Sequence, residues 1–176
     1  NMDIIRSDSG ISPEEWGIRP NTEADGRIMD RAPARFKTGA KVRSSLISAG
    51  CVVEGTVINS VLSPGVIVKK GAIVRDSVIL EDSVIDNDAT ADLLVCDKHV
   101  HIGKGALIGY GDEEEKKIVN TEHPSHLYCG ITLVGKGVQL PAGMKVGRNC
   151  LIHPGYGCNG EKASNERGHG VVFSTE

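Results

Sequence analysis

Aromatic residues are scarce in this sequence of 176 residues, because Phe, Trp and Tyr together make up 3% of it. A core without large rings has to be built from aliphatic side chains. The formal net charge of −3 excludes the strongly basic surface of a general nucleic-acid-binding protein. No run of 18 apolar residues exists, so no membrane-spanning helix is predicted. We therefore expect a soluble, cytoplasmic protein.

Cysteine pairs of the kind that bind zinc are also missing. The five cysteines, at positions 51, 96, 129, 150 and 158, are odd in number and include no C-x-x-C pair. Neither a disulfide framework nor a zinc knuckle is predicted from this spacing. Cys51 and Cys150 lie in aliphatic segments, where we expect buried, reduced thiols.

What the sequence does contain is a column of aliphatic residues with a period of six. A small or turn-prone residue, such as Gly71 or Gly137, follows three positions after each member. This period fits neither an α-helix nor a simple alternating strand, but it fits short strands separated by tight corners. It predicts an all-β fold, a single-stranded left-handed parallel β-helix of hexapeptide repeats. The column consists of Val68, Val74, Leu80, Val134, Leu140, Val146 and Ile152.

The pattern divides the chain into three parts. Residues 1–39 lack the period and are predicted to be an irregular connector that leans on the open end of the solenoid. Residues 40–155 are predicted to form the β-helix, with a charged, turn-rich loop at 109–130 expelled from it. The polar tail, 156–176, is either disordered or folded back over the last coil. Leu80 and Ile102 are 22 positions apart, which predicts a distorted turn near 86–88.

Two histidine-based hypotheses follow from the repeat. Some hexapeptide-repeat proteins hold zinc between subunits with three histidines, two of them five residues apart. The pairs His99/His101 and His123/His126 do not have this spacing, so no metal site is predicted. Other hexapeptide-repeat proteins are trimeric acyltransferases that use a histidine as general base. His123 or His126 in the loop would be that base, and this remains the alternative function.

The lysines of the repeat are ambiguous from periodicity alone. Lys98 and Lys136 each hold the third place of a unit, but that place is polar in most other units as well. The pattern by itself therefore predicts only solvated corners at these positions.

Several stretches, in their order along the chain, resemble the C-terminal domain of the ADP-glucose pyrophosphorylase family, also called glucose-1-phosphate adenylyltransferase. Asn1-Met2-Asp3 is similar to the end of that family's catalytic domain. The resemblance covers nearly all of residues 1–155. It is carried by residues 31–36, 42–51, 53–57, 60–66, 74–79, 96–103 and 130–137.

The resemblance implies a nucleotidyltransferase that makes ADP-glucose and pyrophosphate from ATP and glucose 1-phosphate for glycogen or starch synthesis. It implies that Mg and ATP bind to a catalytic domain that precedes residue 1 and is missing here. We expect no catalytic residue and no cofactor in this fragment, which should be inactive alone. Its expected role is to bind anionic phosphorylated effectors that regulate the enzyme and to mediate assembly, usually into a homotetramer. We also expect it to contact its own catalytic domain. The effector, the nucleotide sugar and the assembly of the fragment stay open.

The resemblance also implies an effector site. Lysines of the family's D-K-x-x-x-I-G and G-I-x-x-V-x-K segments fall on Lys98 and Lys136, and Arg148 is a third candidate. The two lysines are 38 residues apart, and leaving out the 22 of the loop leaves 16. That is near the roughly 18 residues of one three-sided coil that the resemblance implies. We therefore expect Lys98 and Lys136 on neighbouring coils, where both ammonium groups can contact one phosphate.

Overall fold

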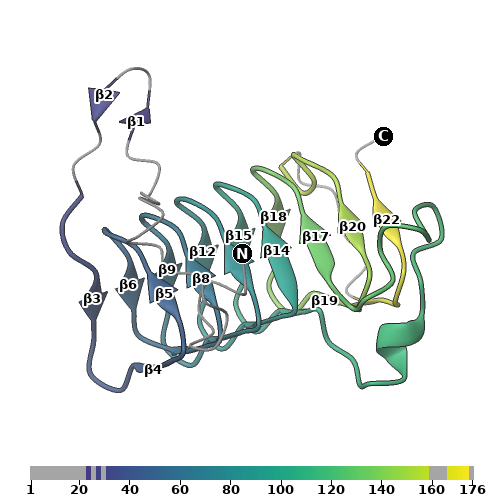
Figure 1. Cartoon of the computed structure of the whole chain (residues 1–176), viewed down its shortest axis with the longest axis horizontal. Coiled ribbons are helices and arrows are strands. Elements are labelled where there is room, and N and C mark those ends of the chain that lie inside the picture. The colour runs from purple at the N-terminus through teal and green to yellow at the C-terminus, as the bar shows by residue number, and fades with distance from the viewer. Residues whose placement is uncertain (1–22, 25–26, 29–30, 159–165, 175–176) are drawn as a thin grey trace, which may run out of the picture.

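The computed structural model describes residues 23–24, 27–28, 31–158 and 166–174, and three parallel sheets dominate them. Each turn of the chain adds one strand to each sheet in succession, so the sheets are the three walls of a prism (Figure 1). The predicted all-β architecture is confirmed, and it is consistent with the left-handed β-helix that hexapeptide repeats form. Residues 1–22 of the expected connector lie outside the described residues.

The strands of the three walls are short. Wall 1 consists of β3 (Arg35–Phe36), β6 (Val52–Val53), β9 (Ile67–Val68), β12 (Val84–Ile85), β15 (His101–Ile102) and β18 (Gln139–Leu140). Wall 2 consists of β4 (Lys41–Arg43), β7 (Thr56–Ile58), β10 (Ile73–Arg75), β13 (Thr90–Asp92), β16 (Leu107–Ile108), β19 (Lys145–Val146) and β21 (Glu166–Arg167). Wall 3 consists of β5 (Leu46–Ile47), β8 (Val61–Leu62), β11 (Val78–Ile79), β14 (Leu94–Cys96), β17 (Thr132–Val134), β20 (Leu151–Ile152) and β22 (Val172–Phe173).

Two further features lie outside the walls. Strands β1 (Glu23–Ala24) and β2 (Arg27–Ile28) pair antiparallel in a sheet separate from the three walls (Figure 1). The segment between β16 and β17 leaves the prism and contains one 3-10 turn, η2 (Glu115–Lys117). Among the described residues there is no helix able to cross a membrane.

Strands of the walls also occur on both sides of the predicted β-helix range, 40–155. At the N-terminal side, β3 already pairs with β6 in wall 1. At the C-terminal side, β21 extends wall 2 and β22 extends wall 3. Residues 166–174 of the expected tail thus contribute one strand to wall 2 and one to wall 3.

The core is a stack of inward-facing aliphatic side chains, about one from each strand. Most of the predicted column is confirmed, since Val68, Val74 and Ile152 are fully buried. The thiols expected in the interior are there as well: Cys51 and Cys150 are free and buried. Burial raises the pKa of Cys96, the third buried thiol, to about 12. These thiols therefore act as small apolar core residues.

The prediction for Leu80 is wrong, because Ile79 occupies the inward position and is fully buried. Each coil in this region has 17 residues rather than 18. One corner, between wall 2 and wall 3, is a residue shorter than the others. The turn near residues 86–88 is not distorted either. Asp88 has a φ of 60° there and donates its backbone N–H to Lys70 O, as Gly105 does to Asn87 O one coil later.

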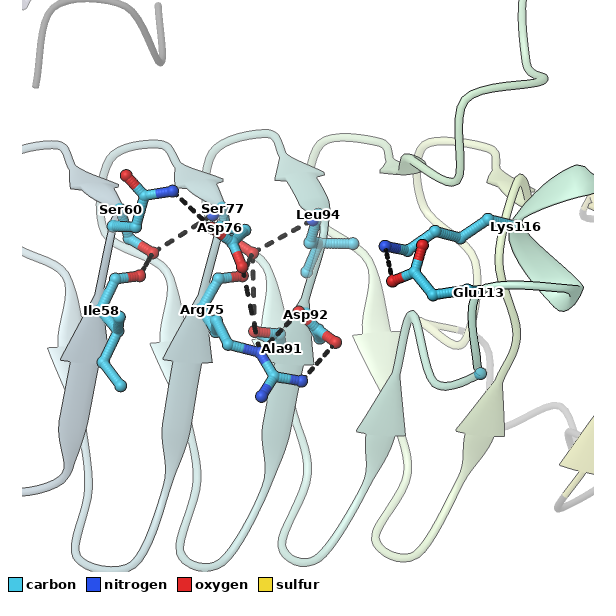
Figure 2. A network of polar contacts seen from close by, with 12 residues as sticks. Ile58, Ser60, Arg75, Asp76, Ser77, Ala91, Asp92, Leu94, Glu113 and Lys116 are labelled. Carbon is cyan, nitrogen blue, oxygen red and sulfur yellow. Dashed lines mark hydrogen bonds and ion pairs between the residues drawn. The ribbon is translucent and has the colours of Figure 1, made fainter. Parts of the chain in front are cut away.

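The short corner is built around stacked serines, Ser45, Ser60 and Ser77. Ser60 Oγ accepts a hydrogen bond from Ser77 N at 3.2 Å and donates one to Ile58 O at 2.7 Å. Ser77 Oγ repeats the arrangement one coil later, with Leu94 N at 3.1 Å and Arg75 O at 2.6 Å (Figure 2). Ser60 and Ser77 are buried. A hydroxyl fits here because it is small and both accepts and donates.

We predict that Ser77→Ala destabilises the protein by about 1–3 kcal/mol, because it leaves the buried Leu94 N–H without its acceptor. Urea unfolding followed by circular dichroism measures this loss. Ser63→Ala is the matched control, since Ser63 is half-buried and its hydroxyl makes no hydrogen bond to a described residue. Equal stability of the two variants would contradict the role of the stacked serines in holding the short corner.

Candidate functional site

The corner between wall 3 and wall 1 brings Glu81, Lys98 and Lys136 onto three successive coils. The backbone N–H of His99 donates to Glu81 O, and that of Gly137 donates to Lys98 O, each at 2.9 Å. Neighbouring coils are about 4.8 Å apart, the spacing of paired strands. This register agrees with the expected separation of Lys98 and Lys136 by one coil. Their role in binding an effector stays a prediction.

The two lysines of this corner differ in their surroundings. Lys98 Nζ lies 3.6 Å from Glu81 Oε1, and its side chain is 36% exposed. Lys136 is exposed and makes no ion pair with a described residue. We call Glu81, Lys98 and Lys136 the lysine corner. Two ammonium groups one coil apart can act as two point charges toward the oxygens of one phosphate.

The structure does not bring Arg148 to the lysine corner. Arg148 follows β19 and lies on the corner between wall 2 and wall 3, although its place in the hexapeptide matches that of Lys136. Its side chain is 4% exposed, and Nη2 contacts Asp92 Oδ2 at 3.0 Å and Gly111 O at 2.9 Å. The position of Arg148 therefore does not support its expected role as a third contact to the effector.

Asp92 is the buried centre of an ion cluster formed with buried Arg148 and half-exposed Arg75. Besides Arg148, it binds Arg75 through two hydrogen bonds, at 3.0 Å to Nε and 2.7 Å to Nη2 (Figure 2). Burial by itself would raise the pKa of Asp92. The hydrogen bonds and charges of Arg75 and Arg148 outweigh burial and hold this pKa below its ordinary value. The cluster ties wall 2 to the start of the loop that contains Gly111.

Buried asparagines hold the loop of residues 109–130 against the last coils. Asn149 Nδ2 donates to the carbonyls of Lys116 and Ile118 at 2.9 and 2.7 Å, and its Oδ1 accepts from Gly130 N at 2.7 Å. From the loop side, Asn120 Nδ2 donates to Asn149 O at 2.8 Å. The loop thus leaves the prism as predicted (Figure 1), but these hydrogen bonds attach its middle and its C-terminal end to the last coils.

The histidines of the acyltransferase hypothesis are not oriented by a carboxylate of the described residues. His123 and His126 are both exposed, and His126 Nδ1 lies 2.9 Å from the hydroxyl of its neighbour Ser125. Neither forms an ion pair with a carboxylate among the described residues. A general base is normally oriented by such a partner. The described part of the chain also contains no group of three or more His, Cys, Asp or Glu side chains able to hold a metal ion.

Sequence reasoning missed Glu81 as a member of the corner. Its distance from Lys98 is 17 residues, the coil length in this region, whereas the family resemblance implied roughly 18. The signal was therefore present in the irregular spacing of the aliphatic column. The buried pairing of Asp92 with Arg148 had no such signal, because the two residues are 56 positions apart across the inserted loop.

Comparison with a family model and with individual known proteins agrees in both cases with the resemblance noted in the sequence. Residues 32–124, more than half of the chain, match the GlmU-like C-terminal hexapeptide family. A glucose-1-phosphate adenylyltransferase of Thermomicrobium roseum is 51% identical over 77% of this chain and 31% of its own length. The corresponding protein of Acetivibrio thermocellus is 37% identical over 69% of this chain and 28% of its own. The chain therefore spans about a third of the length of these relatives.

A more distant likeness exists to a solved structure, the acetyltransferase domain of PglB from Neisseria gonorrhoeae. The TM-score is 0.41 at 15% identity, over 71% of this chain and 48% of that one. This likeness is too small to indicate a shared activity.

We predict that Asn120→Ala loosens the loop without unfolding the coils, since it removes the hydrogen bond to Asn149 O and the turn formed with Glu122 N and His123 N. Trypsin should then cleave after Lys116 or Lys117 about tenfold faster, as expected for the loss of roughly 1.4 kcal/mol. Asn87→Ala, at a coil corner, is the control, because the side-chain amide of Asn87 makes no hydrogen bond to a described residue. Unchanged cleavage of the Asn120 variant would contradict the anchoring.

The Asp92 cluster predicts a pH dependence of stability. Because the pKa of Asp92 is lowered in the folded state, its contribution is complete above the unfolded pKa of about 3.9 and is lost as pH falls through the folded value. Asp92→Asn should cost about 3 kcal/mol at pH 7, since it leaves buried Arg148 without its counter-ion. The difference from the wild type should shrink below pH 4. Chemical unfolding from pH 7 to pH 3 measures it, and a constant difference would argue against the ion pairs.

Proposed function

Because the chain belongs to the GlmU-like C-terminal hexapeptide family and is similar to glucose-1-phosphate adenylyltransferases, we propose that it is the regulatory and assembly part of such an enzyme. The whole enzyme would transfer the adenylyl group of ATP to glucose 1-phosphate, and a catalytic domain outside this chain would bind ATP and Mg. The fragment would then be inactive alone. Its contribution would be to bind a phosphorylated effector and to pass that event to the catalytic domain.

The lysine corner is the observation that carries this proposal. It places two exposed or half-exposed ammonium groups on adjacent coils of a rigid scaffold, with the carbonyl of Lys98 fixed by Gly137 N. Phosphate esters present several anionic oxygens on one small centre, which two lysines at this spacing can contact together. Because the coils are held by backbone hydrogen bonds, the spacing is set before the ligand arrives.

The assembly part of the proposal rests on the relatives and on the shape of the fold. A prism with flat walls offers long faces to a neighbouring domain or subunit. Wall 3 carries an outward row of aliphatic residues in register, of which Leu46 is 38% and Val95 37% exposed. A cytoplasmic homotetramer is the assembly that we propose, with the enzyme's own catalytic domain as a further partner.

We predict that Lys136→Gln weakens binding of fructose 1,6-bisphosphate to this chain about tenfold, the effect of losing roughly 1.4 kcal/mol from a charged contact. Isothermal titration calorimetry at low ionic strength measures the Kd. Lys104→Gln is the matched control, since Lys104 is another exposed corner lysine without an ion pair to a described residue.

Two results would reject the proposed site. One is equal affinity of the wild type and the Lys136 variant, and the other is an equal loss in the Lys104 variant, which would indicate unspecific attraction. Acetyl-CoA is titrated in parallel. Thermal stabilisation by acetyl-CoA, with none by the bisphosphate, would favour the acyltransferase hypothesis instead.

A further inference from the structure

The lysine corner contains an acid that the effector hypothesis leaves unused. Glu81 occupies the place of Lys98 one coil earlier, as the hydrogen bond from His99 N to Glu81 O shows. Its side chain is 15% exposed, so the carboxylate lies against the protein rather than in open solvent. One of its oxygens, Oε2, is buried and has no hydrogen-bond partner among the described residues.

The ion pair between the Glu81 carboxylate and Lys98 is a long one. Glu81 Oε1 and Lys98 Nζ are 3.6 Å apart, which is within the range of an ion pair but longer than a hydrogen bond between charged groups. A tight pair would hold the ammonium group in one place. At this distance Lys98 is neutralised in part and keeps the freedom to turn toward another anion.

We propose that Glu81 is a built-in counter-ion that competes with bound anions for Lys98, and so sets the affinity of the lysine corner for phosphorylated ligands. This inference rests on the proposed function of the corner. A phosphate that approaches Lys98 meets the field of a fixed carboxylate on the neighbouring coil. It therefore binds displaced toward Lys136, which is one coil further from Glu81.

The charge of the corner supports this assignment. With Glu81 ionised, the three side chains sum to one positive charge, and without it they sum to two. Glu81 Oε1 is 3.6 Å from Lys98 Nζ. The coil that carries Glu81 is about 4.8 Å from that of Lys98 and about twice as far from that of Lys136. At these distances charges still interact at low ionic strength, where the Debye length is about 30 Å at 0.01 M salt. Neutralising Glu81 should therefore strengthen anion binding and steepen its dependence on salt.

The test is Glu81→Gln, which keeps the shape of the side chain and removes its charge. Fructose 1,6-bisphosphate is titrated into this chain by calorimetry at low and at moderate ionic strength. We expect the Kd to fall about three- to tenfold at low salt and the gain to diminish as salt is added. Glu54→Gln is the matched control, because it removes the same charge from the pair that Glu54 forms with Lys37, just after strands β6 and β3 of wall 1.

A double-mutant cycle separates competition for Lys98 from a general change of field. If Glu81 acts through Lys98, the gain from Glu81→Gln should be clearly smaller in a Lys98→Gln background. Thermal unfolding checks that each variant is folded. Glu81→Ala, which also removes the unpartnered Oε2, takes the place of the glutamine variant if the latter does not fold.

The outcomes distinguish this inference from the proposed function. A Kd of the Glu81 variant within twofold of the wild type, with weaker binding in Lys136→Gln, would overturn the counter-ion and leave the effector site standing. A similar gain in the Glu54 variant would overturn it too, as an effect of net charge. Absence of any bisphosphate binding to the wild type would reject the site and the counter-ion together.

Discussion

The backbone hydrogen bonds between coils are the constraint on which the rest of the structure depends. They run parallel along all three walls and hold each residue next to its equivalent in the coil above, as Val57, Val74 and Ala91 are held in wall 2. The inward side chains can stack only if every coil keeps this register. Since the prism is too narrow for many rings, the scarcity of aromatic residues and the aliphatic core have the same cause.

The same register turns sequence positions into columns on the surface. Residues 17 apart become neighbours, and residues 38 apart do so across the loop of residues 109–130, as Cys96 and Val134 show. A corner residue is thereby repeated along the axis, with a new side chain at each coil. In one such column the repetition places Glu81, Lys98 and Lys136 in line. A charged site can thus arise on a rigid scaffold without any change in the fold.

The loop shows how the scaffold accepts an insertion. It leaves after β16 and returns before β17, and the walls continue in register beyond it. Its attachment depends on buried polar groups, namely the amides of Asn120 and Asn149 and the Arg148–Asp92 pair. Arg148 belongs to this attachment and not to the lysine corner. Its buried position shows that an equal place in the hexapeptide does not mean an equal place in space, because successive hexapeptides lie on different walls.

The amino-acid sequence by itself determined the fold class, the course of the loop and the adjacency of Lys98 and Lys136. The fold class and the loop follow from a local period that most coils repeat. The adjacency of the two lysines follows from that period together with the coil length that the family resemblance implies. Only the tertiary structure decided that Ile79 rather than Leu80 faces inward, that Glu81 joins the two lysines, and that Asp92 neutralises Arg148. Each of these depends on the shorter corner held by Ser60 and Ser77, or on pairing across the insertion. A one-residue difference in coil length is too small to read from a six-residue pattern, yet it shifts every later side chain to a new neighbour.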